Sequence, residues 1–298
     1  MKTFEEILEK SKNEESIKPT LVVACADDLH VLEAVNKAYL EKMINVILVG
    51  DQFKIEKICK ENNIDFKDFK ILNSLDKKES CDLAIKTLKS EGDILMKGLV
   101  DSSIILKSVL NKESGIKPHG NILSHVGLVE LDTYDKFLFI TDGAMNIAPN
   151  LEEKIEIIKN AVYLAEKLNI SNPKVAVLAA KEKVDDKMPI TKIAQRLEEL
   201  NSLDEIKDCM IQGPLALDNA ISKESVIIKG ITGPVAGNAD ILLVPEIESG
   251  NILYKSLIYF SKAKAAGIIL GADYPIVLTS RADSFENKFL SIALSTIL

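Results

Sequence analysis

The sequence predicts an α/β fold with mostly parallel sheets and flanking helices. Short apolar runs alternate with amphipathic helical periods along almost the whole chain of 298 residues, which is the pattern of strand–helix–strand units. Several of these runs are continuous in Val, Ile and Leu, as expected for parallel strands that are covered on both faces. The composition, 47% hydrophobic and 28% charged, is ordinary for a globular chain with a full core.

Strands are expected where an apolar run is too short for a helix and is bounded by turn residues. In chain order, the expected strands are 21–26, 45–49, 70–72, 94–100, 122–131, 136–141, 174–180, 208–212, 240–245, 267–271 and 275–279. The intervals between them have helical periods, near 29–42, 52–62, 77–90, 101–111, 151–168, 189–202, 249–265 and 284–297.

The helix expected at 151–168 illustrates the signals. Pro149 and Asn150 stand at its start, and acidic residues follow in its first turn, where they complement the helix dipole. Its apolar residues recur along one stripe, as a face packed on a sheet requires. The members of that stripe are Ile155, Ile158, Val162 and Ala165.

Two polar breaks predict two lobes. One break is the segment 131–135, between two strand-like runs, and the other is 272–275. They suggest an inserted domain, with 133–275 as one lobe and 1–132 plus 276–298 as the other. Because ligands favour clefts between lobes and the carboxyl ends of parallel strands, we expect the active site in an interdomain cleft.

Charge and cysteine content exclude several classes. A net charge of −8 argues against nucleic-acid binding, which needs a basic face. The sequence contains no run of 18 apolar residues, so no membrane span is expected. The N-terminal residues resemble the start of an amphipathic helix, not a secretion signal. The four cysteines have neither C-x-x-C nor zinc spacing, so we expect buried free thiols in a cytoplasmic protein and no metal site.

One arginine is conspicuous. Only two of the 37 basic residues are arginines, Arg196 and Arg281. Arg281 follows an expected strand and precedes an expected helix, and its guanidinium offers a rigid fork that fits phosphate or carboxylate. A structural salt bridge is the alternative interpretation.

The residues around Arg281 strengthen the hypothesis of an anion site. A hydroxyl from Ser280 and the free N–H groups of a helix start would both suit a phosphate. Asp283 and Glu286 have the spacing of a capping box, so Asp283 is either a helix cap or a catalytic carboxylate.

Two further segments lie at expected strand ends. Lys97, within an apolar run, needs a partner if it is buried, and Asp101 or Ser102 would cap the next helix. Asp142 follows another strand, with Gly143 beside it, which fits either a turn or a carboxylate directed into a cleft.

The remaining candidates come from three places. Asp218 lies one turn into a helix after the turn at 213–214. Residues Ser249, Gly250 and Asn251 would open a helix whose free N–H groups could receive an anion, with Lys255 one turn further in. Among the histidines His30, His119 and His125, only His125 falls on an expected strand, where it is either structural or an acid–base group.

Together these segments resemble the phosphate acyltransferase family, in its butyryl branch. The resemblance covers essentially the whole chain, and three stretches carry it: 213–220, 244–255 and 279–284. It implies a two-lobed fold similar to isocitrate and isopropylmalate dehydrogenases and a homo-oligomer. It also implies the reversible transfer of an acyl group between coenzyme A and inorganic phosphate, with no required metal or prosthetic group.

Carried over residue by residue, the resemblance implies that Ser280 and Arg281 bind the phosphate and stabilise the developing oxyanion. The family's acetyl branch places a carboxylate shortly after this pair, where this chain has Asn287, which cannot act as a base. Asp283 or Glu286 would have to substitute. The acetyl branch also uses more arginines than this chain has, so Lys97 or Lys255 would replace them.

Three alternatives stay open at this level. The acyl group could be acetyl. The same scaffold could serve as a non-catalytic sensor of acyl-CoA or phosphate. A decarboxylating dehydrogenase would need several arginines and clustered aspartates for a metal, and two arginines in the whole chain count against it.

Overall fold

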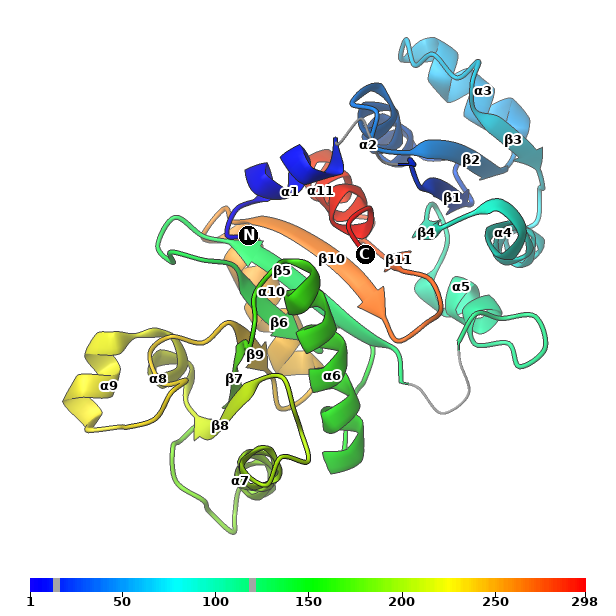
Figure 1. The fold of residues 1–298 in the computed structure, drawn as a ribbon. Coiled ribbons are helices and arrows are strands. Elements are labelled where there is room, and N and C mark those ends of the chain that lie inside the picture. The colour runs from blue at the N-terminus through cyan, green and yellow to red at the C-terminus, as the bar shows by residue number, and fades with distance from the viewer. Residues whose placement is uncertain (13–16, 118–121) are drawn as a thin grey trace. The chain divides into compact units, whose positions relative to one another are not determined.

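The computed structural model describes residues 1–12, 17–117 and 122–298. The chain divides into two compact units. The first unit holds Phe4–Asn121 and Ala265–Leu298, and the second unit holds Met1–Thr3 and Ile122–Lys264. Apart from Met1–Thr3, the second unit is thus inserted in the chain between the two segments of the first (Figure 1).

These limits differ from the expected boundaries at 132/133 and 275/276 because of strand pairing. β5 (Ser124–Glu130) pairs antiparallel with β6 (Leu138–Thr141), so it belongs to the second unit. The polar segment between them is the turn of this hairpin, in which the Tyr134 N–H donates to Leu131 O at 3.2 Å. Towards the C-terminus, the first unit resumes at Ala265, so that it holds nearly all of β10, whose Ile269 lies opposite Ile276 of β11.

The sheet of the first unit has the strand order β3-β2-β1-β4-β11-β10. Its pairs are parallel except for β10 with β11. In the centre, Val22 lies opposite both Ile47 and Leu95. The strands are β1 (Thr20–Ala24), β2 (Asn45–Gly50), β3 (Lys70–Asn73), β4 (Ile94–Lys97), β10 (Lys264–Leu270) and β11 (Ile276–Val277).

Helix α11 packs on both α1 and α2, α3 contacts α2, and α4 packs on α5. The bounds are α1 (Phe4–Ser11), α2 (Leu29–Leu40), α3 (Gln52–Glu61), α4 (Lys77–Glu91), α5 (Ser102–Val109) and α11 (Phe285–Ser295).

The sheet of the second unit has the order β5-β6-β9-β7-β8. All pairs after the β5–β6 hairpin are parallel. The further strands are β7 (Lys174–Leu178), β8 (Met210–Leu215) and β9 (Ile241–Leu243).

Helices cover both faces of this second sheet. Helix α6 lies over one face and α10 over the other (Figure 1). The helices are α6 (Leu151–Lys167), α7 (Pro189–Ser202), α8 (Leu217–Ile221), α9 (Lys223–Lys229) and α10 (Ile247–Tyr259). Within the described part of the chain, no helix is long and apolar enough to cross a lipid bilayer.

The α/β class with mostly parallel sheets is therefore confirmed. Each apolar run expected to be a strand overlaps an observed one. Two helical expectations were wrong or incomplete. Helix α10 begins at Ile247 and not at Ser249, and α9 was not expected at all, since none of its residues is buried and it has no apolar stripe to detect.

The end of β4 is held against β1 by a close backbone approach. The Gly98 N–H donates to Ala24 O at 2.8 Å, and the Leu99 N–H donates to Cys25 O at 2.7 Å. A Cβ atom on Gly98 would lie only 2.1 Å from Cys25 O, so this position requires glycine. The contact fixes where the chain leaves β4, and with it the position of Lys97.

Candidate functional site

In the first unit, charged side chains from three elements gather at the carboxyl end of β4. Lys97 ends β4, Asp101 precedes α5, and Arg281, Asp283 and Lys288 come from the loop and first turn of α11. We call the three basic residues, Lys97, Arg281 and Lys288, the cation cluster. Both Arg281 and Lys288 are close enough to Lys97 to affect its protonation.

Arg281 forms an ion pair with Asp101. The two side chains are 57% and 68% exposed, so an anion from solution can reach the guanidinium. Asp101 occupies the N-cap position of α5, but its carboxylate makes no cap hydrogen bond. The expectation that its side chain caps this helix is therefore wrong, and its carboxylate instead pairs with Arg281.

Lys97 is only 4% exposed. Its Nζ donates to Val100 O at 3.2 Å, which supplies the partner that a buried lysine needs. Burial lowers the pKa of the Lys97 ammonium, and Arg281 and Lys288 lower it further, while Asp101 and Asp283 oppose the shift. A bound anion would relieve the repulsion among these cations.

The residues 280–283 form a closed turn. The Ser280 N–H donates to Asp283 Oδ2 at 2.6 Å, and the Asp283 N–H donates to Ser280 O at 3.1 Å. Lys288 Nζ donates to Ser280 O at 3.0 Å and to Asp283 O at 2.8 Å. The turn is therefore fixed at both ends, with Arg281 at its exposed tip.

The capping box expected for Asp283 and Glu286 was wrong. Ser284 is the N-cap of α11, and its hydroxyl accepts from the Asn287 N–H at 3.1 Å. Since Ser284 satisfies the helix start, the Asp283 carboxylate is not a cap and belongs to the turn.

Asn287 has a structural position. It is 8% exposed, and its Oδ1 accepts from the Ala265 N–H at 3.3 Å. An amide is neutral and cannot take a proton at neutral pH. In this chain, therefore, Asn287 joins α11 to β10 by a hydrogen bond. It stands where the acetyl branch was expected to have a carboxylate.

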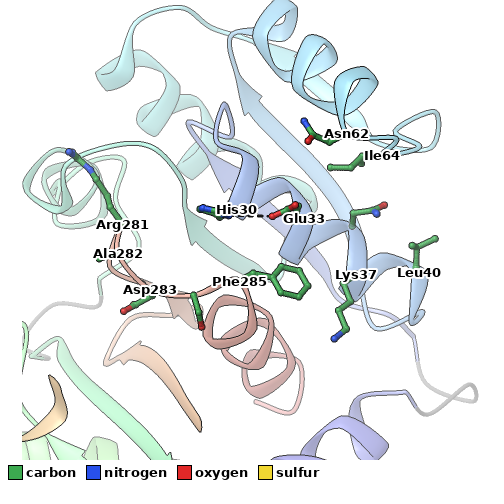
Figure 2. A pocket seen from close by; sticks show the side chains of 12 residues that line it. His30, Glu33, Lys37, Leu40, Asn62, Ile64, Arg281, Ala282, Asp283 and Phe285 are labelled. Atoms are coloured by element: carbon green, nitrogen blue, oxygen red, sulfur yellow. Dashed lines mark hydrogen bonds and ion pairs between the residues drawn. The ribbon is translucent and has the colours of Figure 1, made fainter. Parts of the chain in front are cut away.

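A cavity of about 800 Å³ lies between the turn and α2. Figure 2 shows Arg281, Ala282, Asp283 and Phe285 on one side and residues of α2 on the other, with His30 and Glu33 joined by a hydrogen bond of 3.3 Å. Lys37 lies over the ring of Phe289, 4.2 Å from its centroid. The larger apolar side chains of the lining are Leu40, Ile64 and Phe285.

In the second unit, Asp142 organises the loop after β6. The residue is 2% exposed. Its carboxylate accepts from the N–H groups of Ala144 and Met145, at 2.9 and 3.0 Å, and from Asn146 N and Nδ2, at 3.2 and 2.6 Å. The turn interpretation of Asp142 is confirmed, because these bonds use its acceptor capacity within its own loop.

The start of α10 packs directly on this loop. Asn251 Nδ2 donates to Gly143 O at 3.3 Å, and a Cβ on Gly143 would lie 2.9 Å from the carbonyl carbon of Gly250. The helix begins two residues before Ser249, whose hydroxyl donates to Glu246 O at 2.8 Å. Ser249, Gly250 and Asn251 therefore lie inside the helix and do not open it, and Lys255 is more than two turns from its start.

His125 lies on β5 next to the same region. It is 7% exposed, and its ring meets that of Tyr254 edge to face, with centroids 5.9 Å apart. Its carbonyl accepts from Thr141 Oγ1 at 2.9 Å. The fold thus brings His125, the Asp142 loop and α10 together, although they are far apart in sequence.

Asp218 belongs to a different part of the second unit. It lies in the short helix α8 and pairs with Lys229 of α9 at 2.9 Å. The Lys229 hydrogen bond lowers the pKa of the Asp218 carboxyl. This exposed pair connects the two short helices.

Two buried lysines were missed by the sequence reasoning. Lys288 is 3% exposed and Lys154 is 1% exposed. Lys154 Nζ donates to Val244 O at 3.2 Å and to Pro245 O at 2.7 Å, so it supports the segment that leads into α10. Both lysines lie in amphipathic helices, where a lysine is normally expected on the exposed face, and no local sequence signal indicates that they are buried.

The cysteine prediction is confirmed: all four are free and buried. His119 lies outside the described residues.

Comparison with known proteins gives the family. The profile described as "Phosphate acetyl/butaryl transferase" matches residues 2–91 and 83–296. The chain belongs to this family. A phosphate butyryltransferase from Clostridium beijerinckii is 44% identical over 298 residues, which is 100% of this chain and 98% of that protein. A phosphate acetyltransferase from Thermotoga maritima is 42% identical over 278 residues, 93% of this chain and 94% of that protein. The family assignment makes the chain an acyltransferase.

A solved structure agrees with this assignment. The branched-chain phosphotransacylase from Enterococcus faecalis has a TM-score of 0.82 and 36% identity, covering 94% of this chain and 98% of that one. A 4-hydroxythreonine-4-phosphate dehydrogenase from Klebsiella pneumoniae, with 10% identity and a TM-score of 0.57, shares the fold alone. This agrees with a dehydrogenase-like fold.

We predict that Lys154 makes stability depend on pH. Burial lowers its pKa from 10.5 to about 8, although Asp142, Glu246 and Glu153 act in the opposite direction. Between these values the unfolded chain binds more protons at this lysine than the folded chain, so the free energy of unfolding rises with pH. Measured by urea unfolding, the free energy of unfolding of the wild type should therefore rise with pH relative to that of Lys154→Met across this window, by up to about 3 kcal/mol. The exposed Lys159 of the same helix provides the control, Lys159→Met. A difference in the free energy of unfolding between wild type and Lys154→Met that stays constant with pH would contradict the prediction.

Proposed function

We propose that this chain transfers a butyryl group between coenzyme A and inorganic phosphate, giving butyryl phosphate. The observation that carries the proposal is the placement of Arg281: an exposed guanidinium on a fixed turn, beside two buried lysines. The family membership and the relatives named above support the reaction, and the geometry supports the residues that perform it.

In this proposal, phosphate replaces Asp101 at Arg281. Exposed ion pairs contribute little to stability, so the exchange has a small cost. The guanidinium can hold two phosphate oxygens at once, and the Ser280 hydroxyl lies at the start of the same turn. Lys97 and Lys288 add positive charge around the site, which favours an anion over a neutral ligand.

The acyl transfer then proceeds by direct attack. A phosphate oxygen attacks the thioester carbonyl, an O–C bond forms, and the carbonyl oxygen becomes an oxyanion. The C–S bond breaks as the tetrahedral intermediate collapses, and the proton of the phosphate ends on the sulfur of coenzyme A. Arg281 and Ser280 stabilise the developing charge, and binding both substrates together supplies much of the remaining rate enhancement.

We assign the proton transfer to Asp283. Its carboxylate accepts the Ser280 N–H through Oδ2, which holds it beside the phosphate-binding hydroxyl. In the reverse direction this carboxylate takes the thiol proton of coenzyme A. In the forward direction it takes the proton of the attacking phosphate and delivers it to the departing thiolate.

The remaining candidates are proposed as substrate contacts. Lys97 belongs to the phosphate end of the site. Of the others, His125 lies on β5, and α10 carries Ser249, Gly250, Asn251 and Lys255. Asp142 acts through the loop that it holds, and Asp218 through the α8–α9 pair, because their carboxylates are engaged internally. No tightly bound cofactor is part of the proposal, since coenzyme A is a substrate.

The acyl chain is the part that the relatives distinguish least, because identities of 44% and 42% belong to a butyryl and an acetyl enzyme. We expect phosphate-dependent release of coenzyme A to have its highest kcat/KM with butyryl-CoA in a series from acetyl-CoA to octanoyl-CoA. A maximum at acetyl-CoA would change the substrate but keep the reaction. Absence of release with every member would overturn the proposed function in favour of a binding protein.

We predict that Arg281→Ala lowers kcat/KM for phosphate by at least about 10²-fold, because it removes a donor to the oxyanion and the phosphate. The matched control is Arg196→Ala, which removes the other arginine, an exposed residue of α7 paired with Glu199 at 3.2 Å. Steady-state kinetics with butyryl-CoA compare the two variants. Equal activity in both would contradict the role of Arg281.

We predict that Asp283→Asn slows the transfer from butyryl phosphate to coenzyme A by about 10²–10⁴-fold, the typical contribution of a general base. The loss should shrink as pH rises, since the thiol then ionises without help. Glu286→Gln is the control and should keep wild-type rates. If Glu286→Gln loses activity and Asp283→Asn does not, the base is Glu286.

A further inference from the structure

Lys288 occupies a position that disfavours a lysine on three counts. It lies in the first turn of α11, at the positive end of the helix dipole. It is 3% exposed, and burying an ammonium is costly. It is also close enough to Lys97 to lower the pKa of that second buried lysine. The stability of the helix would be served better by a neutral residue here.

The hydrogen bonds of Lys288 show what the side chain does in this position. Its Nζ reaches back across the helix start to the carbonyls at the two ends of the catalytic turn, Ser280 O at 3.0 Å and Asp283 O at 2.8 Å. These bonds close the turn from the inside, while the Ser280 N–H and the Asp283 carboxylate close it from the other side. Arg281 is thereby presented from a rigid loop of four residues.

We propose that Lys288 is a positioning residue for phosphate. It fixes the Ser280–Asp283 turn so that the Arg281 guanidinium and the Ser280 hydroxyl face one anion, and its charge strengthens the site around them. The inference rests on the proposed function, because it concerns the same turn. It adds a residue that does not touch the reacting atoms but determines where Ser280, Arg281 and Asp283 lie.

A purely structural lysine would give a different result. If Lys288 only joined α11 to the preceding loop, its loss would lower thermal stability and affect both substrates alike. A positioning role predicts a selective loss, because the binding of phosphate depends on the geometry of the turn and the binding of butyryl-CoA is not assigned to it. The separation of the KM values for phosphate and butyryl-CoA therefore distinguishes the two roles.

The experiment compares Lys288→Met with Lys288→Arg in the full-length chain. Lys288→Met removes both bonds and the charge, and we expect its kcat/KM for phosphate to fall by about 10²-fold, with KM for butyryl-CoA changed by less than about threefold. Lys288→Arg keeps the charge and two donors and should recover most of the loss. The matched control is Lys89→Met, because Lys89 also donates to two backbone carbonyls of the first unit, Ser114 O and Gly115 O, both at 3.4 Å. It should behave as wild type.

Two kinetic outcomes would overturn the inference. One is a folded Lys288→Met variant with unchanged kinetics for phosphate, and the other is an equal rise in both KM values. Should Lys288→Met not fold, Lys288→Gln takes its place, because its amide NH2 keeps hydrogen-bond donors without the charge. Failure of both variants to fold would assign Lys288 a structural role only.

The test also separates this inference from the proposed function. If the wild type releases no coenzyme A, the function fails, and the comparison is made on the thermal shift produced by inorganic phosphate alone. A phosphate-induced rise in Tm that is present in wild type and lost in Lys288→Met would still support the positioning role. A rise equal in both would reject it.

Discussion

The functional account depends on one ion pair, between Arg281 and Asp101. It joins the loop before α11 to the start of α5, and both side chains are largely exposed. An arginine held by an exposed carboxylate is prepared for an anion, because the carboxylate keeps the guanidinium in place and can be exchanged at small cost. The surrounding charges favour that exchange, since burial, Arg281 and Lys288 all lower the pKa of Lys97, and a bound anion would relieve the repulsion between these cations and Lys97.

The fold provides the constraint that makes this arrangement rigid. Lys97 is fixed where β4 leaves the sheet, because Gly98 packs against the backbone at Ala24 and Cys25. Arg281 is fixed by the turn that Lys288 closes. In the second unit the same principle recurs, as Lys154 supports the segment before α10 and Asp142 closes the loop after β6. In both units a buried side chain holds a loop by hydrogen bonds to backbone carbonyls or N–H groups.

Much of the fold follows from local sequence, and the exceptions have identifiable physical causes. Continuous Val, Ile and Leu runs mark the parallel strands, because burial on both faces leaves no polar positions. The start of α11 was misplaced because Asp283 and Ser284 are both good cap residues, and the choice depends on the Ser280 N–H competing for the aspartate. Ser280 and Arg281 could be singled out from residue type and position. Lys288 and Lys154 could not, since their burial comes from tertiary packing that a helical period does not encode.

The most direct measurement is a crystal structure of the full-length chain with inorganic phosphate. The account predicts phosphate oxygens within about 3 Å of the Arg281 guanidinium, with Asp101 turned away and the Ser280–Asp283 turn unchanged. A structure in which Arg281 keeps its pair with Asp101 while phosphate binds elsewhere would contradict the central claim.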